Sequence, residues 1–206
     1  MGADVTAKRS RAPSVAVERE LVSAAEAVLV RDGLSGLTVR AVATEAGIAP
    51  MGVYSRFGGK DGLVNALLIM GFDRLRAALD TTAEPDLLEQ LRSCGQRYRQ
   101  FALANPNFYE LMFERAIARE RESDEVRNHA SATFDVLVRS VRLAAAAGLV
   151  EAPDAAEAAQ QIWSAVHGAI ALELKGLILT PDPAATYEAL LVTLIHGIGL
   201  QPPAGS

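Results

Sequence analysis

Residues 38–60 read TVRAVATEAGIAPMGVYSRFGGK, and this stretch decides the fold. It holds two short apolar periodicities separated by Gly47 and Ile48, which predict two small helices meeting at a tight corner. Thr38 can cap the first helix, Gly47 supplies the left-handed residue that ends it, and Pro50 suits the first turn of the second. Two helices joined by a short glycine-containing turn form a helix-turn-helix, whose second helix enters the major groove of DNA.

A longer run around this stretch resembles the TetR family of bacterial transcriptional regulators. The resemblance extends from roughly Val17 to Leu68 and consists of a helix ending in RDG, the segment LT-x-R-x-V-A-x-E-A-G, the aromatic pair in VYSRF, and the Lys-x-x-Leu of KDGL. It implies an all-α chain with an N-terminal three-helix helix-turn-helix DNA-binding domain. A helical ligand-binding and dimerisation domain is expected to follow.

The geometry of the second helix indicates which residues reach the bases. If Val53 and Phe57 face the core, then Pro50, Met51 and Gly52 at the N-terminal end face the DNA. Proline and glycine have no side-chain hydrogen-bonding groups, so Met51 remains there to touch a thymine methyl group. Gly52 either permits closer approach of the helix to DNA or is simply a tolerated small residue.

Direct base readout must therefore depend on Arg40 and Ser55. The resemblance supports Arg40 as a reader of guanine. It places Arg56 where many relatives have histidine, and an arginine there would strengthen backbone binding. It also assigns phosphate contacts to three further residues: Thr38, Tyr54 and Lys60. For Tyr54 the alternative is an aromatic side chain that closes the small domain's core.

A formal net charge of −5 is unusual for a nucleic-acid binder, but the charge is unevenly distributed. Residues 1–70 carry eight Lys/Arg and seven Asp/Glu, whereas residues 71–206 carry twelve and eighteen. The acidity therefore belongs to the second part, and DNA binding needs only a local basic face. Residues 1–13 are expected to form a disordered basic tail, either solvated or contacting DNA, with the cluster Lys8, Arg9 and Arg11.

The sequence predicts domain boundaries near residues 14, 84 and 200. Residues 14–84 form the DNA-binding domain with a connecting helix over 60–79, residues 85–200 form the effector-binding and dimerisation domain, and 201–206 form a tail. In the second domain we expect helices over 86–105, 123–147, 154–179 and 183–199, with a short aromatic segment at 105–114 and a solvated connection at 118–125.

Surplus apolar surface on the last two long helices predicts a homodimer through a four-helix seam. A dimer also suits DNA reading, because two recognition helices related by a twofold axis read a palindromic operator in double-stranded DNA.

The second domain resembles TetR-type C-terminal domains more weakly, through Trp163, His167 and Gly168 and the stretch NPNFYELMF. The resemblance implies a small-molecule effector, which we expect to be largely apolar. The candidate effector-binding residues are aromatic or polar side chains that could converge: Tyr98, Phe101, Met112, Phe134, Trp163 and His167. For each one separately, the alternative is an ordinary core residue. His129 and His196 are expected to be core histidines, and Glu173 to reach solvent or an arginine such as Arg97.

Other classes of protein are disfavoured. Cys94 is the only cysteine, which excludes an intrachain disulfide and predicts a reducing compartment. Neither a signal peptide nor a membrane span is evident, so we expect a cytoplasmic protein. We find no metal-ligand spacing, phosphate loop or nucleophile motif, and so expect no metal, cofactor or catalysis. A helical protein-interaction module and a transcriptional activator without an inducer remain as alternatives to a repressor.

Overall fold

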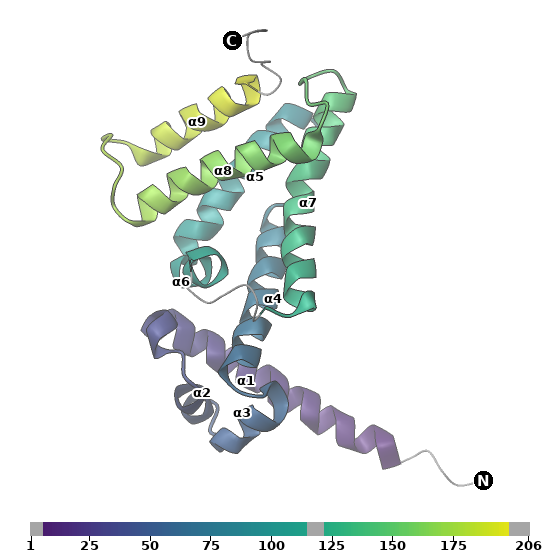
Figure 1. The fold of residues 1–206 in the computed structure, drawn as a ribbon, viewed down its shortest axis with the longest axis vertical. Helices are drawn as coiled ribbons and strands as arrows, with labels where there is room; N and C mark the ends of the chain where they lie inside the picture. The colour runs from purple at the N-terminus through teal and green to yellow at the C-terminus, as the bar shows by residue number, and fades with distance from the viewer. Residues whose placement is uncertain (1–5, 115–121, 198–206) are drawn as a thin grey trace, which may run out of the picture. The chain divides into compact units, whose positions relative to one another are not determined.

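The structure is a computed structural model that describes residues 6–114 and 122–197 of the 206-residue chain, with side chains from residue 15 onward. The described part is helical and contains no strand, as the sequence predicts (Figure 1). Its elements in chain order are α1 (Thr6–Gly36), α2 (Val39–Glu45), α3 (Pro50–Phe57), α4 (Lys60–Ala78), α5 (Leu87–Ala104), α6 (Pro106–Tyr109), the π-helix η1 (Glu110–Glu114), α7 (Asp124–Ala146), α8 (Ala155–Leu174) and α9 (Pro183–Gly197).

The helices divide into two compact units that do not follow the chain in simple order. The first unit comprises residues 1–71 and 107–127, and the second comprises 72–106 and 128–206. Both α4 and α7 therefore run from one unit into the other. Residues 1–5, 115–121 and 198–206, which include half of the expected solvated connection and all of the C-terminal tail, lie outside the described residues.

In the first unit, local chemistry shapes the predicted corner between α2 and α3. The hydroxyl of Thr38 accepts a hydrogen bond from the Ala41 amide at 3.1 Å and caps α2. Gly47 has a φ of 65°, in the left-handed region, and Pro50 begins α3. The cap, the stop and the start predicted from the sequence are confirmed at these three positions.

Helix α1 differs from the sequence prediction at both ends. Its helix begins at Thr6, within the stretch 1–13 that the sequence analysis expects to form a tail. At Gly33 the backbone leaves the helical region with φ 68° and ψ −172°, and one further helical stretch continues to Gly36. Gly33 thus kinks the helix where the sequence predicted its end.

The core of the first unit is formed by aliphatic side chains from α1 to α4. Fully or nearly fully buried members include Leu21, Val28, Leu29, Val42, Val53, Leu63 and Leu67. Val53 is the inward residue that the sequence predicts for α3, whereas Phe57 is half-buried. The buried side of α3 is thereby fixed, and the opposite side of this helix is left to solvent.

The second unit is a layer of α5, α8 and α9 together with most of α7. Its core includes the buried side chains Leu91, Val138, Val141, Ala144 and Ala159. Polar contacts connect α5 to the last two helices: Tyr187 donates to the carbonyl of Gly95 at 2.9 Å, and Arg92 pairs with Glu188 at 3.1 Å. Asp154 caps α8, because its carboxylate accepts hydrogen bonds from the amides of Ala156 and Glu157.

The sequence prediction for the end of α8 needs correction. The helix ends at Leu174 instead of near Leu179, because Gly176 adopts a left-handed φ of 67° and the amide of Leu177 bonds back to Leu172. Glu173 does pair with an arginine, but the partner is Arg99, whose Nε donates to the carboxylate at 2.8 Å.

His129 and His196 differ in exposure and in their hydrogen-bond partners. The Nδ1 atom of His129 lies 2.8 Å from the Asp73 carboxylate, and that of His196 lies 2.9 Å from the Val192 carbonyl. His129 is half-buried and His196 is exposed, so the expectation of core histidines is wrong for His196. Across the described ranges, no helix is long and apolar enough to cross a bilayer.

Candidate nucleic-acid interface and aromatic cluster

Helix α3 presents a solvent-facing surface made of the residues that the sequence predicts to face DNA. The side chain of Met51 is 73% exposed and that of Tyr54 is 52% exposed. Pro50, Ser55 and Arg56 are also exposed, and Gly52 is half-buried. The exposure of Tyr54 argues against a purely core role, because a core-closing aromatic would be buried.

Two cations flank this surface without internal partners. Within the described side chains, Arg40 on α2 and Lys60 at the start of α4 are exposed and make no hydrogen bond or ion pair. Their charges are therefore available to an outside anion, and phosphate oxygens are the usual partners of such groups in DNA.

Three other residues predicted to contact DNA make hydrogen bonds within the chain. Ser55 donates its hydroxyl to the Gly52 carbonyl at 3.1 Å, and Arg56 lies 3.5 Å from the same oxygen. Thr38 uses its hydroxyl oxygen as an acceptor in the α2 cap, which leaves its proton free for a phosphate oxygen. To read a base by donating its hydroxyl proton, Ser55 would have to break its hydrogen bond with the Gly52 carbonyl.

Gly52 has a steric role that the sequence does not reveal. A Cβ atom built at this position would lie 2.7 Å from Cγ2 of Ile48, the residue that follows the turn glycine. The absence of a side chain at Gly52 therefore accommodates the packing of Ile48 under α3. This reason is independent of any contact with DNA.

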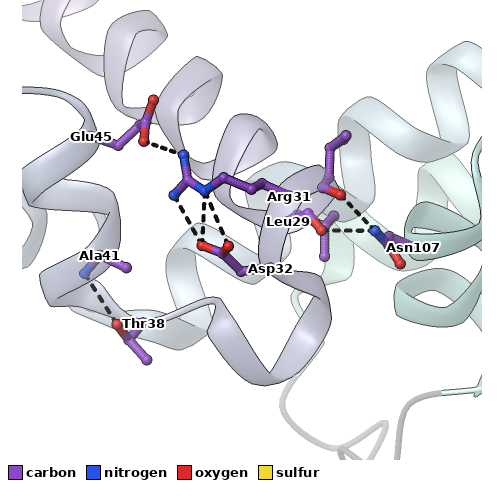
Figure 2. Close-up of polar contacts among 8 residues, drawn as sticks. Leu29, Arg31, Asp32, Thr38, Ala41, Glu45 and Asn107 are labelled. Atoms are coloured by element: carbon purple, nitrogen blue, oxygen red, sulfur yellow. Dashed lines mark hydrogen bonds and ion pairs between the residues drawn. The ribbon is translucent and has the colours of Figure 1, made fainter.

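An arginine at the end of α1 holds α2 in place (Figure 2). The Arg31 guanidinium bonds the Asp32 carboxylate at 2.9 Å and reaches the Glu45 carboxylate on α2 at 2.7 Å. These partners, Asp32 first, raise the pKa of Arg31 above its already high ordinary value. The pair lies in the exposed RDG segment, and sequence reasoning assigned it no function.

Asn107 is a second positioning residue that sequence reasoning missed. Its side-chain amide donates to the carbonyls of Leu29 and Val30, both at 3.0 Å (Figure 2). These carbonyls belong to the helical turn before the Gly33 kink, where normal helical hydrogen bonding is interrupted. Asn107 therefore fixes the end of the straight part of α1 to the segment that starts α6.

In the second unit, four of the predicted effector residues come together. Trp163 donates its ring N–H to the Tyr98 hydroxyl at 3.2 Å, and this hydroxyl lies 3.1 Å from Nδ1 of His167. The Trp163 ring centroid lies 6.0 Å from that of Phe134 and 5.6 Å from that of His167. The cluster thus combines aromatic surface with a short chain of polar groups, a composition typical of ligand sites.

The two remaining candidates lie elsewhere in the chain's core. Phe101 is buried on α5. Met112 belongs to the first unit, where a Cβ atom at Gly71 would lie 2.9 Å from its sulfur. All six residues stay predictions as effector residues.

The buried ionisable groups near α5 are not poised for chemistry. Burial raises the pKa of the Cys94 thiol to about 11, so the thiol stays protonated at neutral pH and is a poor nucleophile. Burial also raises the pKa of Tyr187. Among the described residues, no group of three or more His, Cys, Asp or Glu side chains could hold a metal ion.

Comparisons with known proteins match two family models to successive parts of the chain. Residues 21–67 match the model of bacterial regulatory proteins of the tetR family, and residues 91–194 match the tetracyclin repressor-like C-terminal domain. An uncharacterised HTH-type transcriptional regulator of Mycobacterium tuberculosis is 25% identical over 190 residues, covering 90% of this chain and 83% of that protein.

Two solved structures share the whole fold. A Rhodococcus sp. RHA1 protein of unknown function is 29% identical with a TM-score of 0.79, covering 89% of this chain and 95% of that one. The transcriptional regulator FadR from Bacillus subtilis, solved in complex with stearoyl-CoA, is 17% identical with a TM-score of 0.70, covering 88% and 99%. With its matched helix-turn-helix and its matched C-terminal domain, the chain belongs to the TetR family of DNA-binding transcriptional regulators.

Proposed function

We propose that this regulator is a repressor that binds a palindromic operator as a dimer and is released by a largely apolar small molecule. The observation that carries the DNA-binding part is the exposure of two cations beside α3, Arg40 and Lys60, which have no hydrogen-bond or ion-pair partner among the described side chains. Repression by occupying the operator is the simplest outcome, because it requires no further contact with the transcription machinery.

The dimer is proposed to form through α8 and α9. Regulators of this family act as dimers, and these two helices pack against each other in the second unit. On α8, Gly168 and Leu172 lie one turn apart and both are exposed, and a Cβ atom at Gly168 would meet no heavy atom within 4 Å. On α9, Val192 is exposed as well. An open glycine beside exposed aliphatic side chains suits close approach by a second helix.

Operator recognition can be tested by selecting binding sites from random duplex DNA with the purified protein. We expect an enriched palindrome whose base preference weakens in Arg40→Ala, by about 1–3 kcal/mol at the contacted position. Arg56→Ala is the matched control, because loss of a phosphate contact should weaken binding to all sequences without changing the preference. No enrichment at low salt from folded, dimeric protein would contradict the proposal and favour a protein-interaction module.

The effector site can be followed directly because Trp163 is the only tryptophan of the chain. The first probe is stearoyl-CoA, the molecule bound to the Bacillus subtilis relative. We expect it to change the Trp163 emission and to weaken operator binding about tenfold or more, with operator DNA weakening ligand binding by the same factor.

The Trp163→Phe variant establishes that the emission signal comes from this cluster. A saturating change in emission with no change in operator affinity would contradict the role of this ligand as an inducer, since a ligand shifts an equilibrium only through its differential affinity.

A further inference from the structure

A groove of about 650 Å³ lies between the C-terminal half of α4 and α7, within the second unit. Its lining shares no residue with the aromatic cluster of Trp163 and His167. The floor includes small or aliphatic side chains such as Ala77, Val136 and Val138, and the rim carries charged groups. The groove is thus distinct from the proposed effector site.

Buried and half-buried hydrogen bonds fix the two walls relative to each other. The Thr133 hydroxyl on α7 lies 3.1 Å from the Phe72 carbonyl on α4 and 2.8 Å from the His129 carbonyl of its own helix, and shares its proton between them. One turn away, His129 lies 2.8 Å from the Asp73 carboxylate. The groove is therefore bounded by helices whose spacing is set before any ligand arrives, which lowers the entropic cost of binding.

Some charged groups of the rim already have hydrogen-bond or ion-pair partners within the chain. Asp73 contacts both Arg76 and His129, and Asp80 accepts two hydrogen bonds from Thr82 at 2.7 and 3.1 Å. The hydrogen bonds from Thr82 lower the pKa of Asp80, so it stays ionised and satisfied.

Two of the three arginines of α7, Arg139 and Arg142, have no close polar partner among the described residues, although the charge of Arg139 helps to lower the pKa of the Asp80 carboxyl. Both are exposed and make no hydrogen bond or ion pair with any described residue. They are three residues apart on one helix and therefore face the groove as neighbours. Asp135, on the same helix, is the one lining carboxylate that likewise has no such contact.

We propose that this groove binds a small molecule bearing a phosphate or carboxylate group, with the oxyanion held between Arg139 and Arg142. Two guanidinium groups one turn apart can donate several hydrogen bonds to one oxyanion. Such an oxyanion is held more tightly than it would be by a single hydrogen bond. The aliphatic floor accepts the uncharged remainder of the ligand. Asp135 opposes the anion and limits its affinity.

Calorimetric titration of the full chain at low ionic strength tests this site. The probes are pyrophosphate, which presents charge alone, and octanoate, which adds an alkyl chain. We expect binding of at least one probe, weakened about tenfold in Arg139→Ala and in Arg142→Ala. Binding by octanoate alone identifies a carboxylate amphiphile, and binding by pyrophosphate alone a phosphate ligand.

Two further variants distinguish binding at this groove from nonspecific electrostatic attraction to the protein surface. Asp135→Asn removes a repulsive charge from the same rim and should tighten binding about threefold. Arg19→Ala removes an exposed arginine from α1 and should leave the affinity within twofold. The proposal is overturned if neither probe binds at millimolar concentration, or if the Arg139→Ala/Arg142→Ala protein, folded by circular dichroism, binds as tightly as the parent.

Discussion

Replacing Gly62 by alanine is expected to destabilise the first unit by about 3 kcal/mol and to abolish operator binding. A Cβ atom at this position would lie 1.9 Å from the carbonyl oxygen of Phe57, the last residue of α3. The obstacle is backbone, so the clash cannot be relieved by turning a side chain. Helix α3 would have to shift away from α4, carrying its DNA-facing residues with it.

Urea unfolding, followed by circular dichroism and by operator titration, measures both parts of this expectation. Gly197→Ala is the matched control, since a Cβ atom at this position of α9 would meet no heavy atom within 4 Å. Alanine is favoured over glycine within a helix, so we expect a change in stability within about 1 kcal/mol and an unchanged operator affinity. Equal stability of the two variants would contradict the expectation, because it would show that the turn between α3 and α4 accommodates a Cβ atom at position 62.

Replacing Leu172 by aspartate is expected to raise the dimer dissociation constant by about 100-fold or more, because it buries an unpaired charge in the proposed interface. The side chain is 47% exposed in the single chain. Loss of the dimer should lower specific operator affinity by about 10³-fold, since each recognition helix then reads its half-site alone. Sedimentation equilibrium gives the first quantity and operator titration the second.

Leu149→Asp provides the comparison for this experiment. Leu149 is 48% exposed but lies between α7 and α8, outside the two helices of the proposed interface. The variant should remain dimeric and bind the operator as the parent does. Dissociation caused by Leu149→Asp, but not by Leu172→Asp, would place the interface elsewhere.

The sequence predicted the corner between α2 and α3 because its determinants are local. The hydroxyl of Thr38, the left-handed φ of Gly47 and the fixed φ of Pro50 act within a few residues of their own positions. The end of α8 was harder to predict, since apolar residues continue past Gly176 and periodicity alone extends the helix. The glycine's left-handed conformation, and not the apolar pattern, ends it.

Interactions between residues far apart in the sequence were the hardest to predict. The sequence suggested an arginine partner for Glu173, but Arg97 and Arg99 on α5 are both possible until the helix's rotation is known. Asn107 bonds carbonyls 77 and 78 residues earlier, and no periodicity or motif signals such a contact. The sequence predicted that Tyr98, Trp163 and His167 could lie close together. It could not predict which of them form hydrogen bonds, because this depends on how α5 and α8 pack.

The first unit is assembled from two separate pieces of chain, which limits how it can be exchanged between proteins. The segment from Asn107 to Glu114 supplies the buried side chains Phe108, Tyr109 and Leu111 and the Asn107 amide that bonds α1. A chimaera that joins only residues 1–71 to another regulator's effector domain would leave that contact surface without its natural cover. Exchange of DNA specificity within this family therefore requires either transplanting both pieces together or changing only the exposed residues of α2 and α3.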